Sequence, residues 1–69
     1  MAVAGGACSA YRCSVMEDRL YCASTTTLRS LCVGVADAVE RLGRGETVIV
    51  QGSDMQALRA ELESVGRCR

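Results

Sequence analysis

The chain has 69 residues, of which 49% are hydrophobic and 23% are charged. This length allows one small domain and excludes a barrel enzyme or a full dinucleotide-binding fold. Eight basic residues, all arginine, balance eight acidic residues, and there is no histidine. The neutral balance argues against a broad phosphate-binding surface, and the missing histidine removes the commonest general base and metal ligand. We therefore expect no enzyme activity, no cofactor and no metal.

Five cysteines are a high count for so short a chain: Cys8, Cys13, Cys22, Cys32 and Cys68. They fit either a secreted disulfide scaffold or a cytosolic protein that uses reduced thiols as small hydrophobic side chains. The N-terminal residues lack the basic segment and apolar run of a signal peptide, and no stretch is apolar for long enough to span a membrane. We favour a cytoplasmic chain with mostly reduced thiols. The arginine-only bias is typical of a GC-rich bacterial or phage genome.

Residues 10–24 alternate between apolar and polar side chains on either side of Glu17-Asp18. Alternation with period two predicts two strands joined as a hairpin. Since Glu-Asp is not a favoured two-residue turn, we expect a four-residue loop from Met16 to Arg19. Either loop gives the same register, in which the numbers of opposed residues sum to 35 and Cys13 faces Cys22.

Residues 25–42 change to a helical period. One apolar stripe contains Leu28, Leu31, Cys32, Val35, Val39 and Leu42. We expect the cluster Ser24–Thr27 to cap the N-terminus of this helix and Gly43 to supply the left-handed residue after it. Gly34 would lie in the middle of the helix, where it costs about 1 kcal/mol relative to Ala.

Two further elements follow. Residues 46–50 form a β-branched apolar run that predicts a short strand, with the composition of a central one. Ser53 and Gln56 have the spacing of a capping box and predict the start of a second helix, which Gly66 ends. Its apolar stripe contains Met55, Leu58, Leu62 and Val65.

The element order β-β-α-β-α predicts an α+β fold of two layers. Because a crossover through the first helix makes the third strand parallel to the second, the simplest sheet has the order 2-1-3. Both helices then cover one face. Residues 1–9 are rich in Ala, Gly and Ser, and we expect a flexible arm there, followed by a single domain over residues 10–69.

Cys13 and Cys22 form the first candidate site, a thiol pair across the hairpin. Opposed Cβ atoms in an antiparallel pair lie about 4.5–5.5 Å apart, whereas a disulfide needs about 3.5–4.5 Å. The pair is therefore either a slightly strained disulfide, a redox pair, or two core thiols. Zinc is not expected, because the cysteine spacing lacks the close pairs of a structural site.

The outer face of the sheet is the second candidate site. It would present Arg12, Met16, Arg19, Tyr21 and Ile49. Tyr, Met and Arg are enriched at protein interfaces, so we expect a non-catalytic interaction module that forms a homodimer and binds a larger protein. Two alternatives stay open. One is a sheet that stacks nucleic acid or nucleotides on Arg12, Arg19 and Tyr21, which the neutral charge disfavours. The other is a thiol or sulfur carrier that uses Cys32.

Two segments resemble known families. The sequence ASTTTLRSL, where the hairpin runs into the expected helix, resembles the corresponding half of the lambdoid phage head–tail joining proteins. The helix that precedes the hairpin in that family is missing. The sequence LCVGVADAVERLGRGETVIV resembles the bacterial sulfur-carrier proteins, but Cys32 is followed by Val33 where that family has proline. Neither resemblance assigns a functional residue to this chain.

Overall fold

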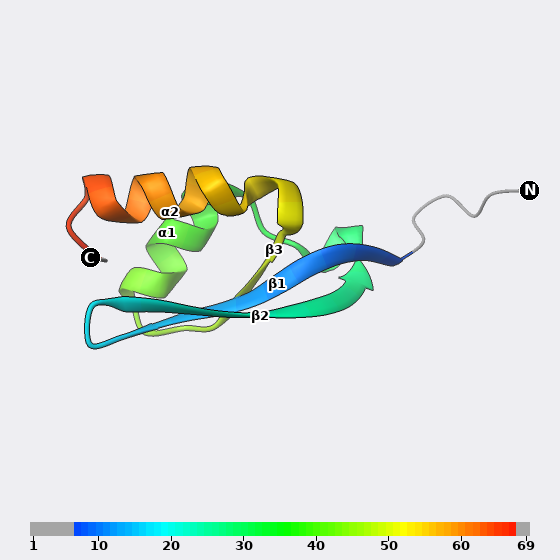
Figure 1. Ribbon diagram of the computed structural model, residues 1–69, viewed down its shortest axis with the longest axis horizontal. Helices are drawn as coiled ribbons and strands as arrows, with labels where there is room; N and C mark the ends of the chain where they lie inside the picture. The colour runs from blue at the N-terminus through cyan, green and yellow to red at the C-terminus, as the bar shows by residue number, and fades with distance from the viewer. Residues whose placement is uncertain (1–6, 68–69) are drawn as a thin grey trace, which may run out of the picture.

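The computed structural model describes residues 7–67, which form a three-stranded sheet and two α-helices (Figure 1). The elements are β1 (Ala7–Met16), β2 (Arg19–Leu28), the 3-10 helix η1 (Arg29–Leu31), α1 (Val35–Gly43), β3 (Val48–Gln51), the 3-10 helix η2 (Gly52–Asp54) and α2 (Met55–Ser64). The sheet order is β2-β1-β3, and β1 is antiparallel to both neighbours. Both helices lie on one face of the sheet (Figure 1). The α+β fold and the strand order predicted from the sequence are confirmed.

The hairpin has the predicted register. Cys13 pairs with Cys22 and Val15 pairs with Leu20, so opposed residue numbers sum to 35 along the whole ladder. The expected four-residue loop is wrong, because Met16 pairs directly with Arg19 and only Glu17 and Asp18 remain in the turn. These two residues have φ angles of 54° and 64°. Positive φ at both central positions is the type I′ geometry that matches the twist of paired strands, although neither residue is the asparagine or glycine that usually supplies it.

β2 continues through the segment expected to begin the first helix. Thr25, Thr26 and Thr27 pair with Ala10, Ser9 and Cys8 of β1, where the sequence suggested a helix cap. Threonine is β-branched and favours a strand, and pairing with β1 satisfies backbone groups that a helix N-terminus would leave open. The strand β1 correspondingly begins at Ala7, so residues 7–9 belong to the sheet and not to the expected arm. Residues 1–6 of that arm lie outside the described residues.

The helix predicted over residues 25–42 is therefore wrong in its first half. Leu31 lies in η1 and is 59% exposed, and Leu28 at the end of β2 is 49% exposed, so neither belongs to the core. The α-helix begins at Val35 with Gly34 as its N-cap. At that position glycine avoids the cost it would have in a helix interior. The left-handed residue after α1 is Gly45, with a φ of 84°, and not Gly43, which is the last residue of the helix.

The core lies between the sheet and the two helices. Its buried side chains are Cys13, Ala38, Leu42, Val48, Val50, Leu58 and Leu62. In α1 the buried positions have helical spacing, and in β3 they alternate, as the two periods require. Val48 and Val50 therefore face the helices, and Ile49 faces the other side of the sheet.

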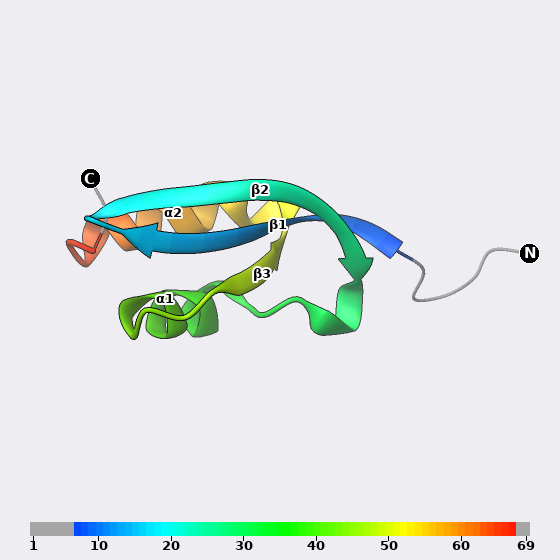
Figure 2. The ribbon, with the colours of Figure 1, turned by 90° about the horizontal axis from the view of Figure 1, so that it is seen from below.

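β3 is a short edge strand and not the central strand that its composition suggested. It pairs with β1 only over Val48–Gln51. On its other side the N–H of Val33 donates a hydrogen bond of 2.9 Å to the carbonyl of Ile49. The segment that leads from η1 to α1 thus lies along this edge and partly protects it. Figure 2 shows the path of this segment, which starts where β2 curves across β1.

The second helix agrees with its predicted stripe but not with its predicted cap. Leu58 and Leu62 are fully buried and Met55 packs against the core, whereas Val65 is 52% exposed. Ser53 lies inside η2, and no side chain caps α2. Gly66 has a φ of 75° and ends the helix as predicted.

Candidate functional site

The thiol pair lies at the centre of the hairpin. A two-residue turn closes with a hydrogen-bonded pair, Met16 and Arg19, and hydrogen-bonded and non-hydrogen-bonded pairs then alternate along the ladder. Cys13 and Cys22 consequently form a non-hydrogen-bonded pair, the type in which opposed side chains approach most closely. The Cys13 thiol donates to the Cys22 sulfur, with the two Sγ atoms 2.8 Å apart. A covalent S–S bond is about 2.05 Å long, so only a small displacement separates these thiols from a disulfide.

The two thiols have different environments. Cys13 is fully buried, whereas Cys22 is half-buried on the edge strand β2. Burial, followed by the hydrogen bond and the charge of Cys22, raises the pKa of Cys13 from 9.0 to about 12. The Cys13 thiol also lies 3.8 Å from the Met55 sulfur of α2. Cys13 is therefore a protonated, enclosed thiol at neutral pH, and Cys22 is the sulfur that a reagent can reach.

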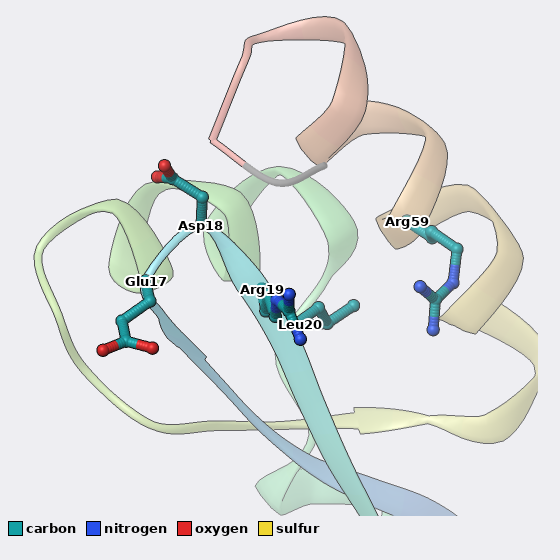
Figure 3. A pocket seen from close by; sticks show the side chains of 5 residues that line it. All are labelled: Glu17, Asp18, Arg19, Leu20 and Arg59. Atoms are coloured by element: carbon teal, nitrogen blue, oxygen red, sulfur yellow. The ribbon is translucent and has the colours of Figure 1, made fainter.

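A hollow lies beside the hairpin turn (Figure 3). It is lined by Glu17, Asp18, Arg19, Leu20 and Arg59. The guanidinium of Arg59 reaches from α2 toward Leu20, whereas the carboxylates of Glu17 and Asp18 point away from it (Figure 3). The charge of Arg59 acts on Cys13 and opposes the rise in its pKa. Arg59 therefore links the hollow to the thiol pair through its charge alone, and the residues that line the hollow bring no acid–base pair together.

A second pair of thiols was missed by the sequence analysis. Burial is the largest cause that raises the pKa of Cys32, and the neighbouring Cys8 thiol is the next. The Cys32 thiol also lies 3.9 Å from the carbonyl oxygen of Leu28, whose strand partner is Ala7. The two cysteines thus meet at the open end of the hairpin. The expected burial of Cys32 on a helix stripe is wrong, since it follows η1 in a loop and is half-buried.

The outer face of the sheet contains all five candidate interface residues. Arg12 is opposite Ile49 on one side, and Met16 is opposite Arg19 on the other. Tyr21, which is opposite Ser14, lies on the same face. Met16 is 57% exposed and Tyr21 is 45% exposed, whereas Ile49 is half-buried. The register therefore gathers these side chains on one surface, on the side of the sheet away from the helices.

The free edge of β2 is the second surface that the sequence analysis missed. In the part of the chain that the structure describes, no strand lies beyond β2. Because odd-numbered residues of β2 make its hydrogen bonds to β1, the N–H and C=O groups of the even-numbered residues, from Leu20 to Leu28, point to the open side. This stretch contains no charged residue and no proline. From Leu20 to Thr26 it is a continuous row of backbone donors and acceptors that β1 does not use, whereas the carbonyl of Leu28 lies 3.9 Å from the Cys32 thiol.

Over residues 7–67 no group of three or more Cys, Asp or Glu side chains is placed to hold a metal ion. None of the described helices is long and apolar enough to cross a membrane. No protein-family model matches the chain, and comparison with the curated proteins and with the solved structures gave no match.

Proposed function

We propose that the protein is a non-catalytic interaction module that forms a homodimer through the open edge of β2. The supporting observation is the length and composition of that edge, which is uncharged and free of proline from Leu20 to Leu28. Natural sheets usually protect an edge with lysine, proline, a bulge or a covering segment, because an unprotected edge pairs with another chain. β3 has such a covering contact from Val33. Among the described residues, the open side of β2 has no neighbouring strand, and its contact with the Cys32 thiol lies at its last residue, Leu28.

A second copy of this chain fits the edge by symmetry. Antiparallel pairing of the whole uncharged stretch with itself centres on Ser24, and Leu20 of one copy then faces Leu28 of the other. Ser24 is one of the residues whose N–H and C=O point outward, so the two copies of Ser24 would exchange two hydrogen bonds at the axis. The product is a six-stranded sheet with all four helices on one side.

Dimerisation also supports the small core and enlarges the outer face. A single core in a chain of this size supplies about 3–5 kcal/mol, and association is one common supplement. Joining two sheets edge to edge duplicates the surface that contains Arg12, Met16, Arg19, Tyr21 and Ile49. We propose that this doubled surface binds a larger protein, since Tyr, Met and Arg are enriched in interfaces.

The test is the mass in solution at micromolar concentration. We expect a particle of twice 7.3 kDa by light scattering. Ser24→Pro removes the outward N–H without removing a hydrogen bond to β1, so it should give a monomer. Ser24→Ala keeps the N–H and should stay dimeric. A wild-type monomer at high concentration, or equal masses for the two variants, contradicts the proposed interface.

The larger partner requires a separate experiment. Tyr21→Glu should abolish its capture from the source cell while the dimer persists, whereas Glu61→Ala, on an exposed position of α2, should change neither. Salt-dependent retention of oligonucleotides that is lost in Arg12→Gln would instead favour the nucleic-acid alternative. The sulfur-carrier alternative predicts selective alkylation of Cys32, and the raised pKa of that thiol argues against it.

A further inference from the structure

The cysteines of the hairpin carry an inference that is independent of the proposed dimer. The two sulfurs are 2.8 Å apart at a non-hydrogen-bonded position, which is where a cross-strand disulfide can form with the least rearrangement of the backbone. They differ in access, because Cys13 is fully buried and Cys22 is half-buried on an edge strand. Two adjacent thiols of unequal access have the arrangement of an attacking and a resolving sulfur.

We propose that Cys22 and Cys13 form a thiol–disulfide exchange site for small disulfide compounds, in which Cys22 attacks first and Cys13 closes the intramolecular bond. The Cys22 thiolate attacks one sulfur of a compound R–S–S–R. A bond forms between Cys22 and one RS group, the S–S bond of the compound breaks, and the second RS group leaves as a thiolate that takes up a proton.

Cys13 completes the exchange. It releases its proton to solvent and attacks the Cys22 sulfur, so that the Cys13–Cys22 bond forms and the bond from Cys22 to RS breaks. The RS group that was bonded to Cys22 leaves as a thiolate and is protonated. In total the protein dithiol is oxidised by two electrons and loses two protons, and the disulfide compound is reduced to two thiols. In the reverse direction the protein disulfide oxidises a dithiol partner.

The burial of Cys13 sets the rate of the second step. Burial is the largest cause of its raised pKa and persists after Cys22 has formed the mixed disulfide. The fraction of Cys13 present as thiolate, and with it the rate of closure, should therefore rise about tenfold for each pH unit below that pKa. At neutral pH the mixed disulfide on Cys22 should be long-lived enough to isolate. The charge of Arg59, which opposes the rise in the pKa, favours closure.

Glutathione disulfide is the probe, and mass spectrometry of the folded full-length chain is the readout. We expect first an adduct of one glutathionyl group on Cys22, then its conversion to a species that lacks two hydrogen atoms and has a Cys13–Cys22 link. Cys13→Ser should stop at the adduct. In Cys22→Ser, the remaining Cys13 should react with glutathione disulfide at least about a hundredfold more slowly than Cys22 reacts in Cys13→Ser. The Cys8→Ser variant controls for the second thiol pair and should leave these rates unchanged.

Several results would overturn the proposal. Equal reaction rates for Cys13 and Cys22 in the two single variants would contradict the division of roles. A dominant link from Cys13 or Cys22 to Cys32, or a dithiol that resists oxidation until the chain unfolds, would contradict the site itself. Far-ultraviolet circular dichroism of each variant shows whether it is folded, and Cys13→Ala replaces Cys13→Ser if the buried hydroxyl prevents folding. Because none of these readouts depends on oligomeric mass, their failure is distinguishable from failure of the proposed dimer.

Discussion

Leu58→Ala should be far more destabilising than Leu31→Ala, although both residues lie on apolar stripes of the sequence. Leu58 is completely buried between α2 and the sheet, whereas Leu31 is 59% exposed in η1. Leu→Ala removes three buried carbon groups at position 58, which costs about 2.4 kcal/mol at about 0.8 kcal/mol each. The cavity that remains raises the expected loss of unfolding free energy to about 3–5 kcal/mol. At position 31 we expect a loss of at most about 0.5–1 kcal/mol.

Urea titration followed by circular dichroism measures both values. A loss of about 3–5 kcal/mol approaches the whole stability that one core of this size supplies, so we expect Leu58→Ala to lack a folded baseline in the titration. Leu58→Met conserves volume and should cost less than about 1.5 kcal/mol, which gives a measurable reference at the same position. If Leu31→Ala proved as damaging as Leu58→Ala, residue 31 would be internal, and the helix expected over residues 25–42 would replace the long β2.

Three other measurements test local features. Replacing Glu17 by Asn and Asp18 by Gly should stabilise the protein by about 1–2 kcal/mol in urea titrations, because both positions have positive φ, and no gain would mean that the turn is not type I′. Gly45→Ala, at a φ of 84°, should cost about 1 kcal/mol, while Gly34→Ala, with open space around its Cβ, should stay within about 0.5 kcal/mol. The unfolding free energy should fall as the pH rises from about 9 toward 12, because the pKa of Cys13 is higher in the folded chain than in the unfolded chain, which loses this proton first. Cys13→Ala should make the unfolding free energy less dependent on pH in this range.

The hairpin was predictable because the residues that determine its register are close together in the sequence. Alternation around Glu17-Asp18 fixes which side chains share a face, and only one register keeps Cys13, Val15, Leu20 and Cys22 together. The turn geometry was not predictable from its own residues, since Glu rarely adopts positive φ and Asp favours the first central position of a type I′ turn, which Glu17 occupies here. The long antiparallel ladder on both sides imposes that conformation.

The segment from Thr25 to Leu31 could not be assigned locally. Its threonines suit a helix cap and a strand equally, and Leu28, Leu31 and Cys32 have helical spacing by coincidence of composition. What decides between the two is a distant partner, the N-terminal end of β1, which the sequence presents as an Ala- and Ser-rich arm. The same error concealed the approach of Cys8 to Cys32, because a helix from residue 25 would carry Cys32 away from that end of the hairpin.

The thiol pair and the open edge of β2 both depend on one register. A slip of one residue would move Cys22 to the outer face and would turn the N–H of Ser24 from the open side toward β1. A change that disturbs the register must therefore abolish disulfide formation and dimerisation together. Ser24→Pro removes only the outward N–H of Ser24, and Cys22→Ser removes only the thiol of Cys22. Each variant therefore changes one of the two properties and leaves the register intact. Loss of one property without the other in these variants would therefore identify two separate surfaces on a single, intact hairpin.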